Sequence, residues 1–366
     1  MIADRIRLAR RKAGLSLRAL SDAMDGRVTA QAIGKYERGE SIPSSGVLLA
    51  LAKALDVSLG YLLDTQGIAL AGVEFRTKAS TTARDRAQVE TEVLEWVERY
   101  LRIEKILELD SAEWQCPLPC PRRLKSIAEA EDLANEVRKK WELGLDTIPN
   151  MTELLEEKGL KVLTVPLPAR VSGFTCLVQR ADGEPLPVIV VSNQFSLERR
   201  RFTLAHELAH RLIDTDSLSD KDEEEKAANV FAGAFLMPRA HLLREVGKTR
   251  HAIGYKELID LKRLYRVSGA ALLVRLRQTE VISDAILTYA LQSIARTWRT
   301  QEPVELEPPK ERGRRERAQR FERLCYWALA EGLISLTKAS ELLRLPISDV
   351  EAGLKGPQDA DADHCQ

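Results

Sequence analysis

The hydrophobic positions of this chain predict a protein built mainly from amphipathic helices. Over most of the sequence, apolar residues recur every three or four positions, the spacing that puts them on one face of a helix. Between 1 and 64 these helices are short and separated by tight turns, which is typical of a helix-turn-helix module. Ser16 is expected to cap the second helix. The expected helices are Ile2–Ala13, Leu17–Met24, Ala30–Arg38 and Val47–Leu55.

The middle of the chain adds a small sheet to this helical pattern. Three β-branched runs bounded by Gly, Pro or Asp are predicted as strands. They are Lys161–Val165, Phe174–Val178 and Val188–Val191. Two amphipathic helices, Ala128–Leu143 and Met151–Lys158, precede them, and a longer one runs from Val89 to Leu107. The long helix is expected to pack on the sheet-containing domain or on a second copy of itself. The predicted fold class is α+β, mostly helical.

Further helices follow the sheet. An apolar stripe from Phe202 to Ile213 predicts one helix, and a second runs from Asp222 to Leu236, where Pro238 ends it. A pair of helices, Lys256–Tyr265 and Ser268–Leu276, looks like a helix-turn-helix but is expected to serve packing or substrate docking.

Seven segments follow from these patterns. The C-terminal part should hold two helices, Phe321–Gly332 and Leu336–Leu345. Segment 301–320 is rich in proline and charge, so an exposed connection or a charged helix start is expected there, and the acidic end is expected to be disordered. The segments are 1–64, 65–124 with a linker and the long helix, 125–245, 246–300, 301–320, 321–356 and 357–366.

One short motif carries the chemistry. His206 and His210 are four residues apart on a predicted helix, so their side chains share one face and can bind a single zinc ion. Glu207 points roughly 100° away from His206, where it could take a proton from a metal-bound water. Two surface histidines on an ordinary helix are the alternative interpretation.

A third ligand would complete a catalytic zinc site. Glu225 lies one turn before Ala228 and Asn229, so it shares a face on which small residues allow close packing. An exposed acidic residue is the alternative for Glu225. Glu223 and Glu224 are expected to form a solvated helix start, where the helix dipole favours acidic side chains.

These residues resemble the ImmA/IrrE family of metallopeptidases over roughly 125–280. The motif from Arg200 to His210, then Glu225 three residues before Ala228-Asn229, then Leu236-Met237-Pro238, carries the resemblance. It implies a zincin-like metallopeptidase domain. His206, His210 and Glu225 would be the zinc ligands and Glu207 the catalytic base. It also implies that substrate is bound as an added strand on a sheet edge beside the metal. Ala209 stands where the family usually has glycine.

The N-terminal region resembles the Xre/Cro repressor family over about residues 3–64. The string from Ile33 to Glu40, followed by Ile42-Pro43, carries this resemblance. It implies that the third helix enters the major groove of duplex DNA. Leu17 stands where the family commonly has glutamine, and a module for dimerisation or partner docking is the alternative. The candidate DNA contacts are Arg18, Ala30, Gln31, Ala32, Lys35 and Arg38.

Composition limits the cellular setting. The 366 residues include 55 Lys and Arg and 55 Asp and Glu, so attraction to DNA must come from local patches. No apolar run suggests a membrane span, and the start of the chain does not look like a signal peptide. The five cysteines are scattered, which favours a reducing compartment and hence the cytoplasm. Cys116 and Cys120 are expected to be loop cysteines rather than a second metal or redox site.

Together these features predict a zinc-dependent endopeptidase coupled to a DNA-binding module. Its expected partners are duplex DNA and a protein substrate, for which a repressor is one candidate, and a homodimer is one assembly that DNA binding allows. The alternative is a DNA-binding regulator whose metallopeptidase-like domain acts as a sensor or interaction platform. The complete set of three ligands and Glu207 favours the enzyme, because a sensor does not need the general base.

Overall fold

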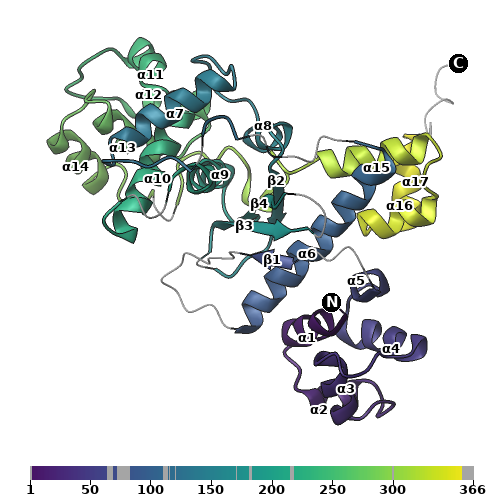
Figure 1. Ribbon diagram of the computed structural model, residues 1–366. Helices are drawn as coiled ribbons and strands as arrows, with labels where there is room; N and C mark the ends of the chain where they lie inside the picture. The colour runs from purple at the N-terminus through teal and green to yellow at the C-terminus, as the bar shows by residue number, and fades with distance from the viewer. Residues whose placement is uncertain are drawn as a thin grey trace, which may run out of the picture.

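The computed structural model has the predicted, mostly helical α+β fold (Figure 1). It describes residues 2–63, 69–71, 83–109, 114, 116–119, 121–169, 171–180, 184–214, 218–298 and 301–356. Residues 2–63 form α1 (Ile2–Lys12), α2 (Leu17–Ala23), α3 (Ala30–Glu37), α4 (Ser45–Leu55) and α5 (Leu59–Leu63). Of the helices described, none combines the length and the apolar character that crossing a membrane would need.

Hydroxyl caps begin α2 and α3. The backbone N–H of Ala19 donates to Ser16 Oγ at 3.0 Å, and that of Ala32 donates to Thr29 Oγ1 at 3.2 Å. These oxygens satisfy N–H groups that have no partner inside the helix. The predicted Ser16 cap is therefore confirmed.

The N-terminal region packs on the long helix α6 (Ala83–Ile106) through α1. α1 packs against α6, and Arg5 of α1 forms a buried ion pair with Glu98 of α6. Arg5 also donates to the backbone oxygen of Tyr61 at 2.6 Å, with its guanidinium 5.1 Å from the centre of the Tyr61 ring. Because a buried charge is costly without such partners, these contacts hold the helix-turn-helix region on α6.

Four strands form one sheet in the order β1-β3-β4-β2. They are β1 (Ala69–Ala71), β2 (Lys161–Val165), β3 (Gly173–Gln179) and β4 (Leu186–Ser192). β2 is parallel to β4, whereas β3 is antiparallel to both β4 and β1. The three predicted strands are confirmed. The sequence does not predict β1, because three residues are too few to show a strand pattern.

The sheet separates two hydrophobic cores. Val188 and Val190 of β4 belong to the core shared with α6, while Ile189 and Val191 belong to the core shared with α9 (Leu197–Leu212). This alternation follows from side chains pointing to opposite faces along a strand. Of the two uses predicted for the long helix, packing on the sheet-containing domain is confirmed.

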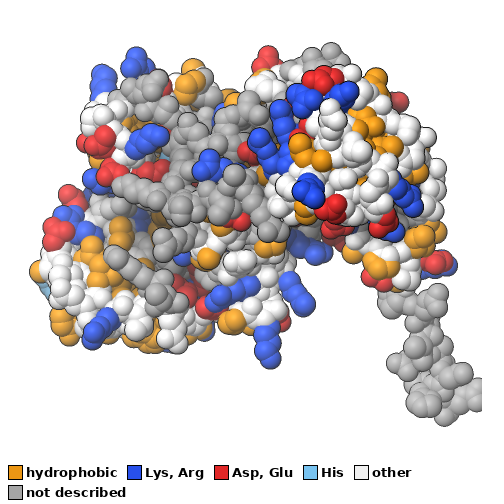
Figure 2. Space-filling model, turned by 90° about the horizontal axis from the view of Figure 1, so that it is seen from below, with side chains coloured by type: hydrophobic (Ala, Val, Ile, Leu, Met, Phe, Trp, Pro, Cys, Tyr) orange, Lys and Arg blue, Asp and Glu red, His pale blue; other side chains and the backbone are white. Residues whose placement is uncertain are grey.

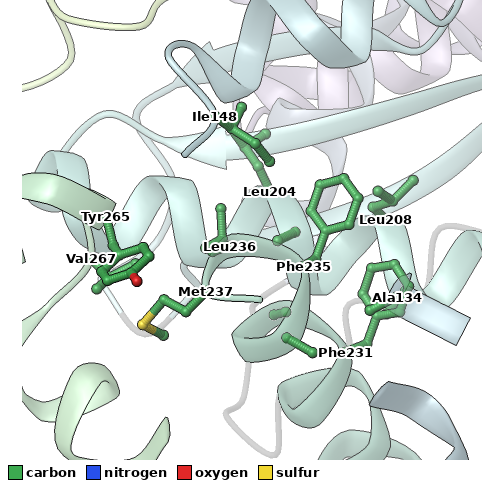
Figure 3. Packing of buried hydrophobic residues seen from close by; sticks show 14 of the residues in the cluster. Ala134, Ile148, Leu204, Leu208, Phe231, Phe235, Leu236, Met237, Tyr265 and Val267 are labelled. Carbon is green, nitrogen blue, oxygen red and sulfur yellow. The ribbon is translucent and has the colours of Figure 1, made fainter. Parts of the chain in front are cut away.

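A helical layer covers the face of the sheet opposite to α6. It contains α7 (Glu129–Lys140), α8 (Met151–Glu157), α9, α10 (Lys221–Leu236), α11 (Arg239–Val246), α12 (Tyr255–Tyr265), α13 (Gly269–Gln278) and α14 (Asp284–Gln292). Phe231 and Phe235 of α10 stack with ring centres 5.6 Å apart, beside Ala134 of α7 and Leu208 of α9 (Figure 3). The expected helix pair, α12 and α13, also packs into this core.

The segment between α14 and α15 (Arg320–Ala330) lies at the surface over most of its length, with a 3-10 turn at Pro309–Glu311. Several of its glutamates turn inward, against the expectation of an exposed connection. Glu307 is fully buried and accepts a hydrogen bond from Arg200 at 2.6 Å, and Glu316 pairs with Arg201. Both arginines lie in α9, more than a hundred residues earlier, so the pairing has no local sequence signal.

The C-terminal region contains α15, α16 (Leu336–Leu343) and α17 (Ile347–Lys355), one helix more than predicted. It packs on α6, where the rings of Phe321 and Tyr100 lie 5.5 Å apart. Cys116 is disulfide-bonded, which the scattered cysteines did not lead us to expect, and its partner lies outside the described residues. The predicted tail, 357–366, and Cys120 also lie outside them.

Candidate metal centre

Small side chains bring α9 and α10 together. Ala205 and Ala209 of α9 and Ala228 and Ala232 of α10 are fully buried in the same core. Because alanine adds little bulk, the two helices can approach closely and present longer side chains to one another across their contact.

This contact brings the three predicted ligands together. Nε2 of His206 and Nε2 of His210 are 3.0 Å apart. The Glu225 carboxylate lies 3.3 Å from Nε2 of His206 and 3.5 Å from Nε2 of His210. One donor atom from each residue lies within 4.8 Å of the other two, so the group can surround one ion.

The spacing of these donors suits zinc. A tetrahedral ion with ligands at about 2.0–2.2 Å requires donor atoms roughly 3.3 Å apart. The observed separations bracket that value. Two imidazoles and one carboxylate are also a ligand set that catalytic zinc sites use, with a further position left for water. The donor set and its spacing therefore fit a zinc ion.

The opposite nitrogen of each histidine faces a polar group from α10. Nδ1 of His206 lies 3.2 Å from Oδ1 of Asn229, and Nδ1 of His210 lies 3.7 Å from Oε1 of Glu224. Acceptors at Nδ1 favour the tautomer that carries its proton there, which leaves Nε2 able to bind metal. Asn229 and Glu224 can therefore orient the two imidazoles.

Glu224 corrects one expectation. It is only 5 % exposed, whereas the sequence predicts a solvated helix start. Like Glu225, it lies about one turn before a small buried residue, in this case Ala227 or Ala228. The same spacing argument that selected Glu225 would therefore have found Glu224. Glu223 does serve the helix start, where Ser219 donates to its carboxylate at 2.7 Å.

Glu207 is buried in α9 between the two histidines, with 6 % of its surface exposed. The sheet lies close by, because α9 packs against β3 and β4. Burial is the main cause that raises the pKa of the Cys176 thiol to about 12, with Arg211 opposing and Glu207 adding to the shift. The predicted base therefore lies on the helix that packs against β3.

Negative charges around His206 offset the effect of burial on its pKa. Desolvation lowers the pKa of His206, but the hydrogen bond to Glu225 and the charges of Glu207 and Glu225 outweigh it, so the pKa is raised. The same negative charges favour a bound cation. The group is therefore electrostatically suited to a metal ion.

The helix-turn-helix region presents most of its predicted DNA contacts to solvent. Arg10 of α1 forms a bidentate ion pair with Glu37 of α3, at 2.6 and 2.7 Å, which holds α3 against α1. Arg38 pairs with exposed Glu40. The exposed candidates are Arg18, Gln31, Lys35 and Arg38, while Ala30 and Ala32 are half-buried.

Seen from the side of the helix-turn-helix region, basic side chains are interspersed with acidic and apolar ones (Figure 2). This mixture agrees with the zero formal net charge of the chain. Any attraction to DNA must therefore come from a few local basic residues rather than a uniform field.

A helix bearing two histidines, a second helix bearing a glutamate, and an adjoining sheet are the features of a metallopeptidase domain. Comparison with known families agrees. Residues 155–277 match the IrrE N-terminal-like domain, and residues 6–62 match a helix-turn-helix family. The chain thus combines an IrrE N-terminal-like domain with an N-terminal helix-turn-helix domain.

A curated relative points the same way. The radiation response metalloprotease IrrE of Deinococcus deserti is 38 % identical over 103 residues. The alignment covers 25 % of this chain and 36 % of the relative, so the chain spans about a third of the relative's length. The similarity supports a metallopeptidase-type domain here.

Proposed function

We propose that the chain is a zinc-dependent endopeptidase that cleaves a repressor-type protein and thereby regulates transcription. The observation that carries this proposal is the convergence of His206, His210 and Glu225, with Glu207 buried on the same helix. A purely structural histidine pair would require neither a third donor at matching distance nor a neighbouring buried carboxylate.

The residues divide the chemistry among themselves. His206, His210 and Glu225 would hold the ion, and Asn229 and Glu224 would orient the two imidazoles. When bound, zinc polarises a peptide carbonyl and acidifies water. Glu207 takes a proton from the attacking water and delivers it to the leaving amine. Its burial keeps the carboxylate away from bulk solvent, which strengthens its electrostatic influence on the reacting groups.

The sheet offers a means of binding substrate. β3 runs beside α9, since a Cβ built at Gly173 would lie 2.6 Å from Cγ2 of Thr203, one turn before Glu207. An extended peptide paired with the outer edge of β3, the edge that faces away from β4, would therefore pass close to Glu207. Backbone pairing of this kind accepts many sequences, so side-chain pockets would supply the specificity.

The helix-turn-helix domain gives the peptidase a location. We propose that residues 1–64 bind duplex DNA through Gln31, Lys35 and neighbouring residues of α3, as a homodimer on two half-sites. A peptidase held on DNA meets DNA-bound repressors at high local concentration. A role in DNA binding would also place the chain in the cytoplasm.

The decisive experiment compares the parent chain with Glu207→Gln. This change keeps the size of the side chain but removes the proton acceptor. We expect near-normal zinc content and hydrolysis of a repressor-type protein slower by about 10²–10⁴-fold. Zinc would be measured by elemental analysis, and cleavage by mass spectrometry of the products. Hydrolysis at the parent rate would exclude Glu207 as the base.

A second variant tests the metal. His210→Ala should lose most of the bound zinc, because two ligands hold the ion poorly, and hydrolysis should stop with it. His241→Ala is a matched control, since His241 lies on α11 and contacts Tyr265 instead. Zinc-loaded parent protein that cleaves no repressor-type protein would favour the alternative of a DNA-binding regulator with a metallopeptidase-like sensor.

A further inference from the structure

The outer edge of β3 is occupied by a strand from the connection between the two matched domains. Ala69, Leu70 and Ala71 of β1 pair antiparallel with Gln179, Val178 and Leu177 of β3. β1 follows the last helix of the helix-turn-helix domain and precedes α6, so the two domains are joined through this edge.

The occupied part of β3 lies next to the part that faces the metal helix. Gly173 of β3 lies against Thr203 of α9, one turn before Glu207. β1 pairs with the three residues that follow Cys176 along the same strand. A peptide that used the edge of β3 to reach Glu207 would therefore meet β1 on its path.

We propose that β1 is an internal competitor for the substrate strand, so that the peptidase edge is closed by the chain's own interdomain segment. This inference rests on the proposed peptidase function. β1 has the antiparallel orientation of an added strand, and backbone pairing does not depend on which side chains the strand carries.

The covalent connection makes the competition effective but reversible. The chain continues on both sides of β1, and the Arg5–Glu98 ion pair anchors the preceding domain on α6. This attachment raises the effective concentration of β1 at β3. Only three residues pair, so few hydrogen bonds must break for a substrate to enter. An event that shifts the helix-turn-helix domain could thus open the edge.

A proline scan tests the pairing. In an antiparallel ladder the N–H groups of alternate residues point to the partner strand. Proline removes that N–H and is tolerated where it faces away. Leu70→Pro should therefore behave differently from Ala69→Pro and Ala71→Pro. Positions whose N–H points to β3 form the inward-facing class, and positions whose N–H points away from β3 are the matched control. Amide hydrogen exchange at Leu177–Gln179 should accelerate only in the inward-facing class. Equal exchange in all chains would overturn the pairing.

Competition is measured with a peptide of sequence 66–74 carrying a fluorescent label. It is titrated by anisotropy into zinc-loaded chains with Glu207→Gln, so that no turnover occurs. Variants with proline at an inward-facing position should bind the peptide at least about fivefold more tightly than the chain without proline in β1, because the competing strand has lost hydrogen bonds. Replacement of Ala69–Ala71 by Gly-Ser-Gly should act in the same direction without proline, because glycine keeps its N–H but has a higher entropy cost of forming a strand.

The outcomes separate the two proposals. Equal peptide affinity in all chains would overturn the competitor. The same gain for every proline position would also overturn it, because a general disturbance of the connection would then explain the result. Tighter binding in the inward-facing class alone, without hydrolysis of the peptide or a repressor-type protein by chains that retain Glu207, would support the competitor and reject the peptidase function.

Discussion

Oε1 of Glu224 lies 3.7 Å from Nδ1 of His210, while Glu225, the next residue, approaches Nε2 of the same ring. Two adjacent carboxylates of α10 thus act on opposite nitrogens of one imidazole. Because Glu224 is buried, its charge is little screened by solvent and favours a proton on Nδ1. This leaves Nε2 available as a ligand.

Loss of Glu224 should therefore weaken metal binding without removing a ligand. We expect Glu224→Ala to bind zinc about 10–100-fold less tightly, measured by competition with a chromophoric chelator. Glu223→Ala removes a carboxylate that bonds to Ser219 and should leave the affinity unchanged. Identical zinc affinities in the two variants would contradict an orienting role for Glu224.

A substitution in α3 and one at Arg38, the residue that follows α3, should have different effects on DNA binding. Gln31→Ala should weaken binding to the preferred operator by about 1–3 kcal/mol and relax one base position, since glutamine can pair bidentately with adenine. Arg38→Ala should weaken binding to all sequences and reduce the salt dependence if Arg38 contacts phosphate. Both are measured by binding to a random duplex library at several salt concentrations.

Lys355→Ala is the control for charge, because it removes one positive charge from exposed α17 at the other end of the chain. It should change neither the preferred sequence nor the salt slope. If all three variants lose affinity equally, α3 does not read DNA. If the isolated domain binds no duplex at low salt, the module serves protein docking.

The pairing of Arg201 with Glu316 should be important for folding stability. Arg201 is 1 % exposed and also donates to the backbone oxygen of Ile148 at 2.7 Å. Glu316→Ala would leave this guanidinium buried without its carboxylate, a change that typically costs about 3–5 kcal/mol. Urea unfolding would measure the loss. Glu322→Ala breaks an exposed pair with Arg317 and should cost about 1 kcal/mol or less. Similar losses in both variants would contradict the argument.

Glu156 of α8 should make stability depend on pH. Burial, with a contribution from Glu153, raises the pKa of Glu156 from 4.5 to about 7. The folded state therefore keeps this proton to higher pH than the unfolded state does. Its contribution is fully present below about pH 4.5 and is lost as the pH rises through about 7.

Glu156→Gln should remove this dependence. At pH 8 the variant should be more stable than the parent by up to about 3 kcal/mol, and the difference should vanish near pH 4.5. Unfolding in urea at several pH values measures it. Glu157→Gln, at the exposed neighbour, should follow the parent at every pH. A variant that is less stable than the parent at pH 8 would show that Glu156 is stabilised as an anion.

Local features of this protein could be predicted from its sequence because they depend on residues only a few positions apart. One helical turn brings His206 and His210 onto the same face wherever the helix lies, and Ser16 can cap the helix that follows it. The three main strands also show their own pattern of β-branched residues. The helix bounds and the two candidate histidine ligands follow from such short-range geometry.

Only the tertiary structure distinguishes groups that look alike along the chain. Glu223, Glu224 and Glu225 are consecutive, yet one bonds at the helix start, one is buried against Nδ1 of His210 and one faces both Nε2 atoms. Their roles depend on how α10 is turned against α9. The pairing of β1 with β3 and of Arg201 with Glu316 likewise joins segments more than a hundred residues apart. Such contacts arise from packing and charge compensation in the folded chain, which leave no periodic signal in the sequence.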